Sequence, residues 1–332
     1  MDYTCCTLCP RMCRADRRKA PGYCGCGDRV TAARAALHLW EEPCISGTGS
    51  DGKAGGKGGG TDIGNNGPGG SGAVFFSGCT LRCCFCQNHT ISSGHFGIPL
   101  TAGQLGDVFL RLQDQGAYNI NLVTATQYVP DIIKALDIAK PRLVIPVVYN
   151  SGGYERVETL KELEGYVDVY LPDLKYLDSG LSARYSNAPD YFQFAGPAIK
   201  EMIRQTGELV WDETGELLKK GVIIRHMVLP GCRKDSIRLL QWIKEALPSG
   251  RYLLSLLSQY TPLFQAPDYP EINRPVTTFE YQKVVDAAIE LGLTYGYMQE
   301  KSSARKEYTP SFQLEGLESV SPDVPGRSSL LL

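Results

Sequence analysis

The segment AVFFSGCTLRCCFCQN, residues 73–88, joins an apolar run to a loop crowded with thiols. The apolar run, residues 73–76, is typical of a buried strand. The loop contains four cysteines, which are Cys79, Cys83, Cys84 and Cys86. Three of them follow the spacing Cys-x-x-x-Cys-x-x-Cys. Because structural zinc and ordinary four-iron clusters take four protein ligands, three thiolates would leave one metal position open for a cofactor or substrate.

Length and composition predict a folded, intracellular protein. The chain has 332 residues, of which 43% are hydrophobic, and its net charge is −2. No run approaches the roughly 18 apolar residues of a membrane span, and the N-terminus lacks the apolar region of a secretory signal. We therefore expect a cytoplasmic protein without a membrane partner, and the charge does not indicate nucleic acid. Twelve cysteines in such a protein favour metal binding over disulfides.

Four zones follow from the composition. Residues 1–46 form a cysteine-rich and arginine-rich segment, expected to bind metal. Residues 47–72 are rich in glycine and are expected to form a flexible insert. Residues 73–300 carry the repeating pattern of strands and helices, and residues 301–332 are expected to be a loose tail.

The pattern after residue 73 predicts an α/β fold. Apolar strands are expected at residues 73–76, 119–123, 143–148, 167–171, 222–228 and 252–257. Helical periodicities lie between them, as in Leu105, Val108, Phe109 and Leu112. Near-continuous apolar strands alternating with amphipathic helices are typical of a parallel sheet covered by helices. Six strands favour a partial (β/α)6-type TIM barrel, with a doubly wound open sheet as the alternative. In barrels the chemistry lies at the C-terminal ends of the strands.

The cysteine loop resembles the cluster motif of radical S-adenosylmethionine (radical SAM) enzymes. The segments SGCTLRCCFCQN (77–88), LPDLKY (171–176) and IIRHMVLPG (223–231) resemble, more closely, uncharacterised relatives of pyruvate formate-lyase-activating enzyme. The similarity extends over most of residues 3–46 and 71–300. It implies a barrel of the radical SAM type with a small cysteine-rich N-terminal segment.

The resemblance also implies the cofactors. Cys79, Cys83 and Cys86 would hold a [4Fe-4S] cluster, and Cys84 would not be a ligand. The open iron would chelate S-adenosylmethionine through its amino and carboxylate groups. An electron donor such as flavodoxin or ferredoxin would reduce the cluster, and the resulting 5′-deoxyadenosyl radical would abstract hydrogen from a substrate. The protein would position the reactants and exclude water and oxygen.

Polar residues at the expected strand ends are candidates to bind S-adenosylmethionine. They are Thr124, Asn150, Ser151, Asp173, Lys175, Arg225 and Gln259. Asp173 and Lys175 share one face of an extended segment and resemble a cofactor-contacting pair in the activating enzymes. Arg225 matches a family arginine that could bind the methionyl carboxylate in a bidentate manner. The family's Gly-Gly-Glu-Pro segment is replaced here by residues 124–127, Thr-Ala-Thr-Gln, which puts the glutamate contact in doubt. As alternatives, Asp173 and Lys175 could be a surface pair, and His226 a packing residue.

The N-terminal cysteines offer a second metal site. Cys6, Cys9, Cys13 and Cys24 provide four thiolates, enough to close a coordination sphere around zinc or to bind a second iron–sulfur cluster. Spacing does not separate the two metals, and Cys5 and Cys26 compete for ligand places.

Three functions fit these patterns. The resemblance to the activating enzymes implies an oxidoreductase that activates a glycyl-radical partner polypeptide. The second function is radical modification of an RNA, a peptide or a small molecule. The third is a non-catalytic iron–sulfur or zinc scaffold. The sequence does not identify the substrate.

Overall fold

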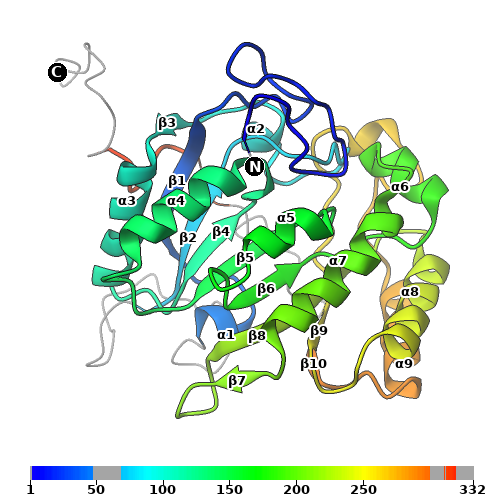
Figure 1. Ribbon diagram of the computed structural model, residues 1–332. Coiled ribbons are helices and arrows are strands. Elements are labelled where there is room, and N and C mark those ends of the chain that lie inside the picture. Colours follow the sequence, from blue (N-terminus) through cyan, green and yellow to red (C-terminus); the bar gives the residue numbers. More distant parts are fainter. Residues whose placement is uncertain (1, 48–68, 300–309, 311, 319–332) are drawn as a thin grey trace, which may run out of the picture.

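A computed structural model describes residues 2–47, 69–299, 310 and 312–318 (Figure 1). Six parallel strands form its centre, and they are β2 (Ser71–Phe76), β4 (Ile120–Val123), β5 (Val147–Ser151), β6 (Val169–Pro172), β8 (Leu218–Met227) and β9 (Leu253–Leu257). Strand β10 (Gly296–Met298) pairs in parallel with β9 and extends the sheet. These strands neighbour each other in chain order. A doubly wound sheet would reverse that order at a switch point. The observed order therefore confirms the partial barrel and contradicts the doubly wound alternative.

One strand differs from its sequence prediction. The apolar run 143–148 predicts a strand there, but β5 begins at Val147 and continues through Asn150 and Ser151. Pro146 has no N–H to donate to the ladder, which explains the late start. The polar end stays in the sheet because both side chains are buried and line a pocket, as described below.

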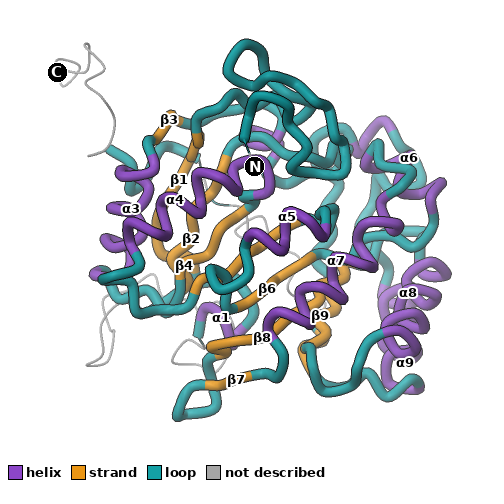
Figure 2. Tube along the Cα trace, viewed as in Figure 1, coloured by secondary structure: helices purple, strands orange, loops and turns teal. Residues whose placement is uncertain are grey.

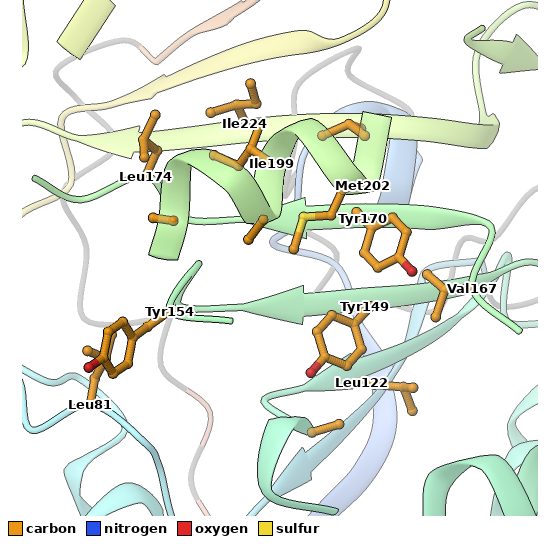
Figure 3. Close-up of a cluster of buried hydrophobic side chains, with 14 of the residues drawn as sticks. Leu81, Leu122, Tyr149, Tyr154, Val167, Tyr170, Leu174, Ile199, Met202 and Ile224 are labelled. Atoms are coloured by element: carbon orange, nitrogen blue, oxygen red, sulfur yellow. The ribbon is translucent and has the colours of Figure 1, made fainter. Parts of the chain in front are cut away.

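Helices cover one face of the sheet (Figure 2). They are α3 (Ala102–Asp114), α4 (Val129–Ala139), α5 (Val157–Glu162), α6 (Ser179–Ser186), α7 (Tyr191–Thr206), α8 (Arg233–Ala246) and α9 (Thr278–Glu290). Thr101 and Gln104 form a capping box that fixes the start of α3. Tyr149 and Tyr170 of the sheet and Ile199 and Met202 of α7 gather in the layer beneath the helices (Figure 3).

The N-terminal segment completes the other face. Strand β1 (Val30–His38) pairs antiparallel with β2, and with the short β3 (Ile98–Leu100) it forms one edge of the sheet. The chain then passes to helix α1 (Pro43–Ser46), which packs Cys44 and Ile45 against inward-facing strand residues, namely Val148, Val169, Leu171, Ile223 and Leu253. The strands are therefore covered by apolar side chains on both faces, which explains why their sequences are almost continuously hydrophobic.

Other described elements are short. Helix α2 (His89–Ser92) follows the cysteine loop, and β7 (Val210–Trp211) pairs with β8. Residues 312–318 pack along β1, where Leu314 N–H donates to Ala33 O and Arg34 pairs with Glu315 at 2.8 Å. Two expected boundaries therefore differ. The insert predicted at 47–72 overlaps β2, which begins at Ser71. Part of the tail predicted to be loose at 301–332 packs against β1. The rest of both segments lies largely outside the described residues. Among the described helices, none is both long and apolar enough to cross a bilayer.

Candidate active site

A pocket lies at the C-terminal ends of the parallel strands. Its lining includes the three cysteines of the motif and all seven strand-end residues predicted from the sequence, which are Thr124, Asn150, Ser151, Asp173, Lys175, Arg225 and Gln259. Six strands or strand ends thus contribute to a single cavity, as expected when parallel strands finish at the same edge.

Each motif thiol has a hydrogen-bond partner. Ser186 Oγ lies 3.0 Å from Cys83 Sγ, and Ser92 Oγ lies 3.2 Å from Cys86 Sγ. The Leu81 N–H donates to Cys79 Sγ at 3.4 Å. Hydrogen bonds of this kind stabilise thiolate ligands and tune the potential of iron–sulfur clusters.

Cys84 is placed differently from its three neighbours. It is 3% exposed and does not line the pocket. Its backbone is held by Tyr185 O at 2.9 Å and by the Gln265 N–H at 2.8 Å. A ligand role for Cys84 therefore finds no support in the geometry.

Cys79 and Cys86 are protonated in the absence of metal. Burial, followed by the neighbouring Cys83, raises the pKa of Cys86 to about 11 and pushes the pKa of Cys79 higher still. Metal binding would therefore release protons. Among the described residues, no three His, Cys, Asp or Glu side chains are arranged as a site for a single metal ion.

A chain of largely buried charges lines the pocket. Lys175 Nζ contacts Asp173 Oδ2 at 2.6 Å, and Arg225 Nε donates to Asp173 Oδ1 at 3.1 Å. Burial alone would raise the pKa of Asp173, but Lys175 and Arg225 outweigh it and hold this pKa below its ordinary value. Asp173 and Lys175, which are 25% and 18% exposed, are thus a largely buried pair rather than the surface pair considered from the sequence.

Arg225 donates to three protein acceptors. Besides Asp173, it reaches Glu41 Oε2 through Nη1 at 3.1 Å and Asn150 Oδ1 through Nη2 at 2.7 Å. A guanidinium has five N–H groups, so one remains on each Nη for a ligand. The bidentate contact to the methionyl carboxylate that the family resemblance implies would have to use these two remaining N–H groups.

Glu41 is a pocket residue that the sequence did not reveal. Its side chain is 8% exposed. The carboxylate accepts from Asn121 Nδ2 at 3.1 Å and from Asn150 Nδ2 at 3.3 Å, and it pairs with Arg225. Burial raises its pKa and Arg225 opposes that effect. Glu41 lies in the cysteine-rich segment, where no strand or motif pattern marks it as part of a barrel.

Comparison with known proteins identifies the family. The sequence model of the Radical SAM superfamily matches residues 73–243. The chain belongs to this superfamily. Membership implies enzymatic catalysis, an iron–sulfur cluster and S-adenosylmethionine.

Relatives of this radical SAM chain give few functional details. Uncharacterized protein MJ0674 of Methanocaldococcus jannaschii is 29% identical over 304 residues, which cover 88% of this chain and 76% of that protein. SuiB of Streptococcus suis, solved bound to the precursor peptide SuiA, is 17% identical with a TM-score of 0.47 over 67% of this chain. The match spans 46% of SuiB. A domain of pyruvate-formate lyase-activating enzyme from Bacteroides vulgatus is 15% identical with a TM-score of 0.38, over 52% of this chain and 90% of that domain.

Aromatic and histidine residues near the motif have packing roles in this radical SAM chain. Phe85 lines the pocket and meets Tyr260 edge to face, with ring centroids 5.7 Å apart. His226 is 2% exposed, and its ring nitrogens lie 2.7 Å from Leu174 O and 2.9 Å from Ser236 Oγ. The geometry therefore favours the packing role for His226.

The segment that replaces Gly-Gly-Glu-Pro holds a buried carboxyl behind the pocket. Thr126 Oγ donates to Glu155 Oε1 at 2.7 Å, and Tyr149 Oη lies 3.4 Å from Oε2. Glu155 is 1% exposed. Burial raises the pKa of Glu155 to about 7, although hydrogen bonds from Thr126, Ser151 and Tyr149 oppose the shift.

Replacing Glu155 by glutamine is expected to change the pH dependence of stability. Because the folded state holds this proton more tightly than the unfolded state, the stabilising contribution is complete below about pH 4.5 and is lost as pH rises through 7. The wild type should lose about 3 kcal/mol of unfolding free energy at this site between pH 4.5 and 8. Glu155→Gln should not show this loss. Urea unfolding of both proteins across that range checks the prediction, and parallel pH curves would contradict it.

The N-terminal cysteines lie apart from the pocket. Cys6, Cys9 and Cys24 are buried, whereas Cys13 is exposed beside Gly22. Cys26, considered only as a competitor, is also buried. Arg17 Nη1 lies 3.8 Å from Cys6 Sγ. No three of these described side chains are arranged as a site for a single metal ion. The second metal site therefore stays a prediction, and the buried Cys26 competes with the exposed Cys13 for a ligand place.

Proposed function

We propose that the chain uses a [4Fe-4S] cluster on Cys79, Cys83 and Cys86 to cleave S-adenosylmethionine reductively and to abstract hydrogen from a substrate. One observation carries the proposal, which is that the three thiols share a pocket with a connected, largely buried group of charges, Lys175, Asp173, Arg225 and Glu41. The donor set fits both cofactors. Thiolates suit iron, and alternating charges suit a zwitterion that bears an amine and a carboxylate.

The pocket residues would bind and orient the cofactor. When bound, the cluster supplies the electron that breaks a C–S bond of S-adenosylmethionine. The free N–H groups of Arg225 would donate to the methionyl carboxylate. Asp173 and Glu41 hold Arg225 from two sides, so its guanidinium is already oriented before the cofactor arrives. Gln259 accepts from Gln299 Nε2 at 2.8 Å, which orients its amide at the rim of the pocket.

Anaerobic incubation of the reconstituted protein with dithionite and S-adenosylmethionine tests this function. We expect 5′-deoxyadenosine to form with the wild type. A protein that holds iron but yields none would favour the non-catalytic scaffold.

A partner polypeptide is the proposed substrate, by similarity to the activating enzymes. Any glycine target must lie in another chain, since this sequence has no Arg-Val-x-Gly-Tyr segment. A polypeptide that co-purifies without air should acquire a glycyl-radical EPR signal when S-adenosylmethionine is added. Modification of an RNA, a peptide or a small molecule without that signal would support the alternative substrate classes.

We further propose that the N-terminal thiols bind a second metal centre. The buried Arg17 guanidinium beside Cys6 would be stabilised by negatively charged metal-bound thiolates. Iron and zinc per chain, measured in the full-length Cys83→Ala variant after anaerobic purification, check this prediction. Zinc alone would indicate a structural site, residual iron a second cluster, and no metal at all would contradict the proposal.

A further inference from the structure

We infer that the cysteine-rich N-terminal segment, residues 2–28, clamps the cluster-binding loop, residues 77–86, with Arg11, Arg17 and Gln127 as positioning residues. The inference rests on the proposed function of that loop. The segment lies outside residues 73–243, which match the superfamily. In Figure 1 its dark blue loops lie at the same end of the sheet as α2, which directly follows the cluster-binding loop.

Gln127 holds the start of the loop. Its Nε2 lies 3.0 Å from each of three carbonyl oxygens, those of Ser77, Gly78 and Thr124. Ser77 and Gly78 join β2 to Cys79, so one amide ties the end of β2 to the end of β4. Gln127 is 1% exposed, and a buried carbonyl that loses its donor costs about 1–3 kcal/mol.

Arg17 connects Gln127 to the cysteine-rich segment. Its Nη1 donates to Gln127 O at 2.6 Å, and its Nε donates to Cys26 O and Gly27 O at 3.1 and 3.0 Å. The side chain is 2% exposed, and its guanidinium lies 4.4 Å from the Tyr3 ring centroid. Arg17 therefore fixes the segment and Gln127 relative to each other.

Arg11 reaches the loop itself. Its Nε donates to Thr80 O, one residue after Cys79, at 3.0 Å. Its guanidinium also stacks 4.3 Å from the Tyr23 ring centroid, and Tyr23 O accepts from Arg82 Nη2 at 2.6 Å. Arg11 of the segment and Arg82 of the loop therefore both contact Tyr23, and these contacts join the segment to the loop.

Gly78 shows how closely the two parts approach. Its φ is +80°, and a Cβ at this position would lie 2.0 Å from Cys26 Sγ. Only glycine is tolerated at such a contact. The segment therefore fits directly against the residue that precedes the first cluster ligand.

This arrangement explains how a loop could hold its thiols in place without regular secondary structure. Residues 77–88 contain neither helix nor strand. Hydrogen bonds from Gln127 and Arg11 would restrain the loop backbone on both sides of Cys79 and lower the entropy lost on cluster binding.

Three full-length variants test the clamp. Arg11→Met and Gln127→Met keep much of the side-chain length but remove the donors. Arg18→Met is the control, because Arg18 belongs to the same segment, is 54% exposed and pairs with Asp16. We expect residues 77–86 of the metal-free, reduced Arg11→Met and Gln127→Met proteins to exchange amide hydrogen about tenfold faster than in the control. Exchange in α7 should stay unchanged, which separates a local effect from general unfolding.

Loss of the reconstituted cluster to a chelator, measured anaerobically, is the second readout. Arg11→Met should lose the cluster roughly tenfold faster than Arg18→Met. If Gln127→Met fails to fold, Arg11→Met alone decides. Exchange and cluster loss equal to the control would overturn the clamp even if 5′-deoxyadenosine forms. If the wild type binds no cluster, the proposed function fails, and the exchange experiment on metal-free protein still tests the clamp.

Discussion

Replacing Cys83 by alanine is expected to abolish 5′-deoxyadenosine formation and to remove the iron held at the pocket. Cys83 lines the pocket together with the other two motif thiols and accepts a hydrogen bond from Ser186 at 3.0 Å. With two thiolates left, the cluster would lose a third of its protein ligands, which four-iron clusters rarely tolerate. Iron content and 5′-deoxyadenosine are measured on the same anaerobically reconstituted sample.

Cys84→Ala is the matched control for this experiment. It removes the adjacent thiol, which is buried but does not line the pocket. This variant should keep its iron and its activity, with a stability loss of about 1 kcal/mol from the lost sulfur packing. If Cys84→Ala lost the cluster and Cys83→Ala kept it, the ligand assignment would be wrong.

Replacing Asp173 by asparagine is expected to destabilise the fold and to impair cofactor binding. The side chain neutralises both Lys175 and Arg225, which are 18% and 16% exposed. Removing the shared carboxylate of a largely buried ion pair leaves the charge of Lys175 uncompensated, and here we expect a loss of about 3 kcal/mol in the free energy of unfolding. Urea unfolding of the metal-free protein at pH 7 measures it. Binding of S-adenosylmethionine should also weaken, because Arg225 loses one of its two carboxylate partners.

Glu158→Gln provides the comparison for Asp173→Asn. Glu158 pairs with Arg156 at 3.0 Å but is 68% exposed, so its loss should cost less than about 1 kcal/mol. Equal losses in the two variants would mean that the buried pairs contribute no more than a surface pair.

The repeating strand and helix pattern predicts the barrel well. Parallel strands buried on both faces leave an unusually clear signal, and strand-end polar residues then fall at one edge by topology alone. These strand positions, together with the resemblance to the activating enzymes, predict that Arg225 lies close to Asp173 and Lys175 although about fifty residues separate it from them. The prediction of a strand at 143–148 was wrong for two reasons. It used apolar content alone and so ignored Pro146, which cannot donate to the ladder. It also missed the polar end of β5, whose side chains line the pocket.

The contributions of Glu41, Gln127 and β1 were not predictable in the same way. Glu41 enters the pocket on a short segment between β1 and α1, and Gln127 acts through backbone carbonyls of residues fifty positions away. Neither residue has a periodic neighbour pattern or a motif spacing. Their roles depend on tertiary placement, which local sequence does not encode. The same holds for β1, whose pairing with β2 joins the cysteine-rich segment to the barrel.

EPR spectroscopy of the dithionite-reduced protein, recorded anaerobically before and after addition of S-adenosylmethionine, tests the central claim most directly. With Cys79, Cys83 and Cys86 as the protein ligands, the account predicts a four-iron cluster whose spectrum changes when the cofactor occupies the open iron. A spectrum that S-adenosylmethionine leaves unchanged, or a protein that binds no iron at these cysteines, would contradict it.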